Sequence, residues 1–161
     1  MWEIIFNYKK YNLNYVFKAS FDKANRSSID SDRGVGLERS CILFEKIKKD
    51  FNVPIITDVH ECWQCEQIAP YVDIIQIPAM LSRQTDLIIS SARKKIVNIK
   101  KGQFMSPQSL GEAIKKAEST NNQKILITER GTSFGYEKLV VDFCGIYEIK
   151  KYGYPLILDV T

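Results

Sequence analysis

Short apolar runs alternate with amphipathic stretches along this sequence, and this alternation limits the possible folds more than any other feature. Runs rich in β-branched residues predict strands, and apolar residues spaced by three or four positions predict helices. The predicted strands are 15–20, 53–60, 72–77, 95–100, 123–128 and 156–160. The predicted helices are 1–12, 37–52, 62–69, 84–93, 108–119 and 143–152. Strands that alternate with helices form right-handed βαβ crossovers, so we expect an α/β fold with a parallel sheet.

Two architectures share this pattern, the doubly wound sheet and the (β/α)8 barrel. No glycine-rich GxGxxG or GK[ST] loop follows a predicted strand, which weighs against the nucleotide-binding doubly wound sheets. Polar residues of one parity recur near the carboxyl ends of five predicted strands: Lys18 and Ser20, Asp58 and His60, Gln76, Asn98 and Lys100, Thr128 and Arg130. Residues of one parity share a face of a strand, and barrel enzymes place their active sites at the carboxyl ends of their strands. We therefore predict a single barrel-type domain over residues 1–161 with a functional site at this edge.

The composition narrows the class of protein. The chain has 161 residues, of which 45% are hydrophobic, enough for one soluble domain with a core. Its net charge of +4 is mild and dispersed, so we expect no nucleic-acid partner. No apolar run approaches a membrane span and the first residues lack a signal-peptide layout, so we expect no membrane partner and a cytoplasmic location. Four cysteines are too few for a disulfide scaffold, which fits the same location.

One pair of cysteines, Cys62 and Cys65, has the CxxC spacing of redox and zinc motifs. No second CxxC exists to complete a zinc site. We therefore interpret the pair as two incidental cysteines on a helix.

The segment that follows the first predicted strand, residues 18–28, concentrates lysine, arginine, asparagine and hydroxyl side chains. It is either a solvated basic loop or an anion site. The predicted barrel mouth favours the anion site, because it would collect five cations: Lys18, Lys23, Arg26, Lys100 and Arg130. So many cations suit a phosphorylated or carboxylated small molecule. Asp58 and His60 are the proton-transfer candidates of the set. The residues thus predict an enzyme of phosphorylated substrates without specifying its reaction.

Long segments of the sequence resemble the 3-deoxy-D-manno-octulosonate 8-phosphate synthase family. The segments are Tyr15–Ser28, Ile56–Glu61, Ile75–Ala79 with Arg83–Asp86, Asn98–Phe104, Glu129–Tyr136 with Leu139–Asp142, and Asp159–Thr161. They occur in the family's order and span nearly the whole chain. Related synthases of aromatic biosynthesis share the barrel and the phosphoenolpyruvate chemistry, but the Lys-Ala-Asn-Arg-Ser segment at 23–27 favours the octulosonate family.

The resemblance implies a transferase that condenses phosphoenolpyruvate with D-arabinose 5-phosphate and water for lipopolysaccharide synthesis, usually as a homotetramer. The products are 3-deoxy-D-manno-octulosonate 8-phosphate and phosphate. It also implies site residues. Phosphoenolpyruvate would be bound by Lys18, Ser20, Lys23, Gln76, Lys100 and Arg130. Arabinose 5-phosphate would be bound by Asn25, Arg26 and Ser27, with Arg83 reaching the site of a neighbouring subunit. The catalytic residues would be Lys23, Asp58 and His60.

The same resemblance covers about six of the family's eight barrel strands, the second to the seventh, so we expect a chain truncated at both ends. Family members are either metal-free or dependent on a divalent metal, and the positions of the metal ligands fall outside this sequence. We therefore expect no cofactor bound by this chain. Two alternatives to the synthase are an inactive remnant, which only binds phosphates or associates with a complete subunit, and a related phosphoenolpyruvate-dependent aldol synthase.

Overall fold

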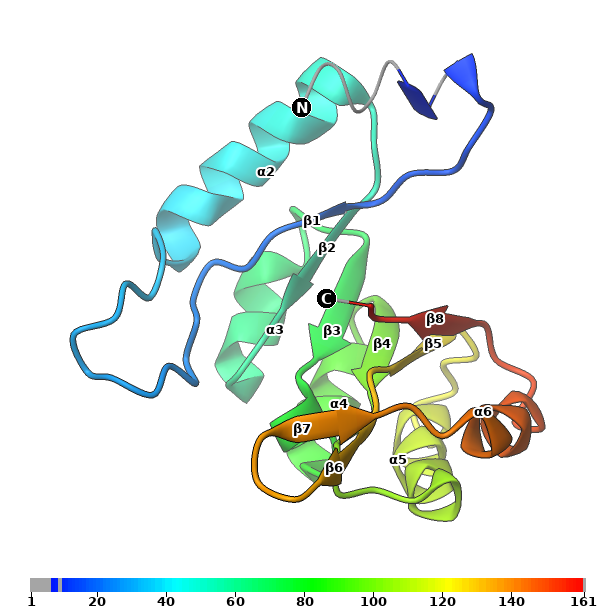
Figure 1. The fold of residues 1–161 in the computed structure, drawn as a ribbon. Coiled ribbons are helices and arrows are strands. Elements are labelled where there is room, and N and C mark those ends of the chain that lie inside the picture. The colour runs from blue at the N-terminus through cyan, green and yellow to red at the C-terminus, as the bar shows by residue number, and fades with distance from the viewer. Residues whose placement is uncertain (1–6, 9, 161) are drawn as a thin grey trace.

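The centre of the protein is a six-stranded parallel sheet, seen in a computed structural model that describes residues 7, 8 and 10–160 (Figure 1). The strands are β1 (Phe17–Lys18), β2 (Ile55–Asp58), β3 (Ile74–Ile77), β4 (Ile96–Lys100), β5 (Ile125–Glu129) and β8 (Leu156–Leu158). Their order in the sheet is β1-β2-β3-β4-β5-β8, so neighbours in the sheet follow one another along the chain apart from one hairpin. This α/β arrangement is that of a partial (β/α)8 barrel and confirms the predicted fold class.

Helices connect the strands and cover one face of the sheet. They are α2 (Leu37–Phe51), α3 (Cys62–Ile68), α4 (Thr85–Ala92), α5 (Pro107–Glu118) and α6 (Phe143–Lys150), with a short 3-10 helix, η1 (Ala79–Leu81). Helix α4 packs on β3 and β4, and α5 packs on β4. The core lies between these layers and consists of alternate residues of the strands, including Ile55, Ile75, Ile77, Val97, Ile99, Ile125 and Ile127. The remaining residues of each strand face the other side of the sheet.

Several helices begin at side chains that pair with their free backbone N–H groups. Ser106 precedes α5 and its hydroxyl accepts a hydrogen bond from the Ser109 N–H at 3.2 Å. Asp142 does the same for α6, accepting from the Cys144 N–H at 3.0 Å. A capping box joins Glu61 and Gln64 at the start of α3. These caps fix where each helix starts after the loop that leaves the carboxyl end of a strand.

The predicted strands and helices occur in the predicted order, with shorter strands. Strand β1 covers two of the predicted residues 15–20, and β2 covers four of the predicted 53–60. Parallel pairing continues briefly beyond both, since the Ala19 N–H donates to the Ile56 carbonyl and the Val59 N–H to the Gln76 carbonyl. Residues 1–6 and 9 lie outside the described residues, and with them lies most of the helix predicted over 1–12.

The sequence pattern did not predict an antiparallel hairpin of β6 (Thr132–Phe134) and β7 (Lys138–Val140). Gly131 and Gly135 have φ angles of 116° and 74°, in the left-handed region that favours glycine. The hairpin follows β5 and contacts the loop after β4, because the Ser133 N–H donates to the Gln103 carbonyl at 3.0 Å. Its strands are three residues long and mostly exposed, so they lack the apolar alternation that marks a longer strand.

None of the helices in the described residues is long and apolar enough to cross a membrane.

The core position of Ile99 yields a stability prediction. Ile99 is fully buried on β4, so Ile99→Ala removes buried methyl groups and leaves a cavity. We expect a loss of about 3 kcal/mol of unfolding free energy, measured by urea denaturation. The control is Ile42→Ala on α2, where the side chain is 69% exposed and the expected change is within about 0.5 kcal/mol. Equal losses in the two variants would contradict the assignment of the core.

Candidate active site

A cavity of about 230 Å³ lies at the carboxyl ends of the strands and collects most of the predicted site residues. Strands β1 to β4 each contribute a side chain to it, and the remainder come from the loops that follow the strands. Its lining comprises Lys18, Ser20, Lys23, Asn25, Asp58, His60, Gln76, Pro78, Ala79, Met80, Lys100, Gln103 and Arg130.

The register of the parallel strands explains why these residues meet. Asp58 on β2 pairs with Gln76 on β3, and Gln76 pairs with Asn98 on β4. Their odd-numbered neighbours, such as Ile75 and Val97, are buried in the core on the opposite face. Since successive side chains of a strand alternate between faces, burying the odd residues turns the even ones towards the cavity.

Four cations line the cavity: Lys18, Lys23, Lys100 and Arg130. Lys23 donates to the Ser20 hydroxyl at 2.9 Å, and Lys100 forms an ion pair with Asp159 just after β8. Burial lowers the pKa of Lys18, and Lys100 and Lys23 lower it as well, while Asp58 acts in the opposite direction. A bound anion would offset this loss and stabilise the charged form of Lys18.

Asp58 and His60 form a pair on the wall of the cavity, with 3.4 Å between Oδ2 of the carboxylate and Nε2 of the imidazole. Burial raises the pKa of Asp58, but hydrogen bonds with His60 and Ser20 outweigh it and leave that pKa below its usual value. Asp58 Oδ1 and His60 Nδ1 are buried and have no hydrogen-bond partner among the described residues. Buried polar atoms are rarely left unpaired, so these two are available to a ligand or a water molecule.

A chain of buried hydrogen bonds crosses three strands beside the cavity. The Thr128 hydroxyl on β5 donates to Asn98 Oδ1 at 2.9 Å. Asn98 Nδ2 on β4 in turn donates to Gln76 Oε1 on β3 at 3.2 Å. All three side chains are buried. These hydrogen bonds therefore connect the amide of Gln76, which lines the cavity, to the side chains of Asn98 and Thr128.

An ion pair on the opposite face of the sheet, Lys101 with Glu129, went unnoticed in the sequence. The Lys101 Nζ and Glu129 Oε2 atoms are 3.5 Å apart, and both residues are 3% exposed. Lys101 also donates to the carbonyl of Met105 and to the Thr132 hydroxyl. The pair thus joins the ends of β4 and β5 directly behind Lys100 and Arg130. Its sequence signal was the two charged dipeptides, Lys100-Lys101 and Glu129-Arg130, in each of which one residue lines the cavity and the other is buried in the ion pair.

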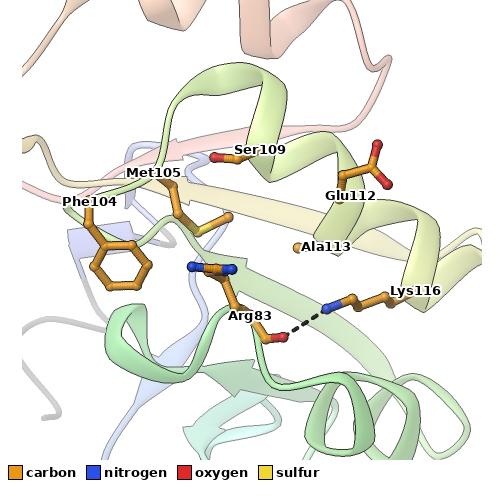
Figure 2. A pocket seen from close by; sticks show the side chains of 7 residues that line it. All are labelled: Arg83, Phe104, Met105, Ser109, Glu112, Ala113 and Lys116. Carbon is orange, nitrogen blue, oxygen red and sulfur yellow. Dashed lines mark hydrogen bonds between the residues drawn. The ribbon is translucent and has the colours of Figure 1, made fainter.

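Three predicted site residues lie outside the cavity lining. Arg26 and Ser27 are exposed in the loop between β1 and α2, where Arg26 Nε donates to the Asp32 carbonyl at 3.4 Å. Arg83 lines a different cavity, of about 380 Å³, together with Phe104, Met105, Ser109, Glu112, Ala113 and Lys116. Figure 2 shows the Arg83 guanidinium extending towards Met105. The backbone carbonyl of Arg83 accepts a hydrogen bond from Lys116 Nζ at 2.8 Å.

Sequence reasoning missed Gln103 and Asp159 as site residues. Gln103 lies in the loop after β4, and no periodic pattern assigns a direction to a loop side chain. Asp159 follows β8 directly but is odd-numbered, so the rule that selects even-numbered polar residues at strand ends left it out.

The described cysteines and acids do not form a metal or redox centre. All four cysteines are free, and burial raises the pKa of Cys65, which disfavours its reactive thiolate. Among residues 7, 8 and 10–160, no group of three His, Cys, Asp or Glu side chains is arranged to hold a metal ion.

Comparison with known proteins gives similarity over nearly the whole chain. Residues 5–161 match the model of the DAHP synthetase I family. A 2-dehydro-3-deoxyphosphooctonate aldolase of Fusobacterium nucleatum is 55% identical over 150 residues, which are 92% of this chain and 54% of that protein. Proteins of the same name from Stutzerimonas stutzeri and Shewanella denitrificans are 54% and 53% identical over 154 residues. Those residues are 95% of this chain and 55% and 54% of the two relatives. The chain thus spans about half the length of the curated relatives it matches.

The electrostatics of the cavity predict a change in the pKa of Lys18. Because burial and neighbouring lysines lower this pKa while Asp58 raises it, Asp58→Asn should lower it further. Nuclear magnetic resonance titration of the lysine side chains measures the value. Asp50→Asn, at the exposed end of α2, is the control and should leave it unchanged. A higher pKa for Lys18 in Asp58→Asn would contradict the charge arrangement.

The Lys101–Glu129 pair predicts a large loss of stability when one partner is removed. Lys101→Met leaves the Glu129 carboxylate buried without its cation, and we expect a loss of about 3 kcal/mol or more in urea unfolding. Lys115→Met breaks the exposed pair with Glu112 and should cost less than about 1 kcal/mol. Similar small losses for both variants would show that the Lys101 pair is not buried in solution.

Proposed function

The chain belongs to the DAHP synthetase I family, and we propose that it serves the synthesis of 3-deoxy-D-manno-octulosonate 8-phosphate from phosphoenolpyruvate, D-arabinose 5-phosphate and water. The observation that carries this proposal is the cavity that four cations line together with the Asp58–His60 pair. The curated relatives support the choice of product, since they are named 2-dehydro-3-deoxyphosphooctonate aldolase.

The cations suit phosphoenolpyruvate, which carries a phosphate and a carboxylate. Lys18, Lys23, Lys100 and Arg130 come from different strands or loops, so they approach a ligand from several sides. Lysines supply point charges, and arginine offers a planar pair of donors that fits a carboxylate or phosphate. Ser20 and Gln76 add directional hydrogen bonds from the same wall.

The proposed reaction forms one carbon–carbon bond and, from water, one carbon–oxygen bond, and it breaks the carbon–oxygen bond to the phosphate. C3 of the enol attacks the aldehyde carbon of the sugar, and the aldehyde oxygen takes up a proton. Water adds at C2, and the phosphate then leaves with cleavage of its bond to C2. Negative charge develops on the sugar oxygen and on the leaving phosphate, where nearby lysines stabilise it.

In the proposed reaction, Asp58 and His60 would position the water molecule and transfer its proton. The depressed pKa of Asp58 keeps it ionised at neutral pH, so it accepts hydrogen bonds and orients its partner. The unpaired atoms, Asp58 Oδ1 and His60 Nδ1, offer an acceptor and a titratable nitrogen close to the cations. We propose that the pair positions the attacking water and transfers its proton.

We propose that the loop after β1 binds the sugar phosphate. Asn25 already lines the cavity, and Arg26 and Ser27 follow it in the exposed part of the loop. Arg83 lies in a separate cavity, which supports a role in the site of a neighbouring copy within a homotetramer. We place the reaction in the cytoplasm and in lipopolysaccharide synthesis on the strength of the family resemblance.

The proposal is tested by phosphate release from phosphoenolpyruvate, measured with and without arabinose 5-phosphate. We expect release that requires the sugar, and a loss of about 100-fold or more in kcat/KM for Lys23→Ala, since this residue would touch the transferring charge. Lys46→Ala on α2, whose side chain is exposed, should retain the parent value.

Three other results would each contradict a part of this proposal. Binding of phosphoenolpyruvate without turnover would identify an inactive, phosphate-binding chain. Turnover with a different aldehyde phosphate in place of arabinose 5-phosphate would identify a related aldol synthase. Near-normal kcat/KM in Lys23→Ala would refute the assignment of the site.

A further inference from the structure

We propose that Thr128 and Asn98 are positioning residues that hold the side-chain amide of Gln76 with its NH₂ group towards the cavity. Neither would touch the substrate. The hydrogen-bond chain itself stands on the geometry alone, whereas the ligand that Gln76 would meet, phosphoenolpyruvate, rests on the proposed function.

The three side chains form a continuous row of hydrogen bonds across β5, β4 and β3, and the row ends at the cavity wall. Thr128 donates its hydroxyl proton to Asn98 Oδ1, and Asn98 Nδ2 donates to Gln76 Oε1. The exposed fractions of Thr128, Asn98 and Gln76 are 3%, 1% and 5%. Because water has almost no access to Asn98, its amide depends on these two partners to satisfy its hydrogen bonds.

The donor-to-acceptor direction of these hydrogen bonds decides which end of the Gln76 side-chain amide faces the ligand. With its Oε1 occupied by Asn98, Gln76 keeps its Nε2 group, which has two N–H donors and makes no hydrogen bond within the described residues. Gln76 lines the cavity, so these donors are the part of the amide available to an anion. An anionic oxygen accepts such hydrogen bonds and would be repelled by the amide oxygen.

The cations of the cavity act against this orientation. Lys18, Lys23, Lys100 and Arg130 attract a carbonyl oxygen, so without a ligand their field favours turning Gln76 Oε1 towards them. The Thr128 hydroxyl opposes this turn, because it donates to the Asn98 oxygen and would have to lose that bond and accept from the Asn98 NH₂ group instead. Removing that hydroxyl frees both amides to rotate together.

The matched pair of variants is Thr128→Val, which keeps the shape and removes the hydroxyl, and Thr128→Ser, which keeps the hydroxyl. Calorimetric titration of the protein with phosphoenolpyruvate measures the dissociation constant of the complex. We expect a rise of about tenfold or more in the dissociation constant for Thr128→Val, because a charge-assisted hydrogen bond is replaced by a repulsive contact. Thr128→Ser should stay within about twofold of the parent.

A double-mutant cycle separates positioning from a general structural effect. In a Gln76→Ala background, Thr128→Val should cause no further loss of affinity, since the group that it positions is absent. An equal loss with and without Gln76, or parent-like binding by Thr128→Val, would overturn the proposal. Asn98→Ser interrupts the same chain at its middle, and it replaces Thr128→Val in the cycle if that variant does not fold.

A measurement without ligand keeps this proposal distinct from the proposed function. In the unliganded protein, the Asn98 side-chain NH₂ protons should show nuclear Overhauser effects to Gln76, both in the parent and in Thr128→Ser. They should point to residue 128 in Thr128→Val. Unchanged contacts in Thr128→Val would refute the positioning role even if phosphoenolpyruvate binds, and failure of the parent to bind it would refute only the proposed ligand.

Discussion

Parallel backbone pairing between strands that are consecutive in the sheet is the constraint on which the rest of this structure depends. Because every strand runs in the same direction, all carboxyl ends meet at one edge of the sheet. After each strand, the polypeptide must return to the opposite edge of the sheet before the next parallel strand can begin. Helices make these connections, and they cover the apolar face of the sheet. The cavity at the carboxyl edge follows from this geometry, since five strands end there with polar residues.

Because successive side chains of a strand alternate between faces, the two faces of the sheet have different roles. Odd-numbered residues such as Ile75, Ile99 and Ile127 make the core, and even-numbered residues make the cavity. The Lys101–Glu129 pair is the exception, because two charges lie on the apolar side. Their position at the ends of β4 and β5 connects the core directly to the backbone that carries Lys100 and Arg130. Core packing and the placement of these two cavity-lining cations therefore meet at the same two strand ends.

The order of the elements and most of the cavity lining were predictable, because both follow from local periodicity. Lys18, Asp58, Gln76, Lys100 and Arg130 share a parity and a position at strand ends, and these are properties of the linear sequence. The β6–β7 hairpin was not predictable in this way, since its strands are short, exposed and supported by a contact to Gln103 far back along the chain. The ion pairs of Lys100 with Asp159 and Lys101 with Glu129 join residues on different strands, so no local pattern contains them.

The sequence by itself determined the α/β class, the parity that separates core from cavity, and the family through its long motifs. These properties depend on residues that are neighbours in the chain or share one strand. Only the tertiary structure decided which charges neutralise one another, that Arg83 lines a different cavity from Lys18, and that hydrogen bonds link Thr128, Asn98 and Gln76. Such contacts depend on the register between strands and on side-chain direction, which are set by packing in three dimensions rather than by spacing along the chain.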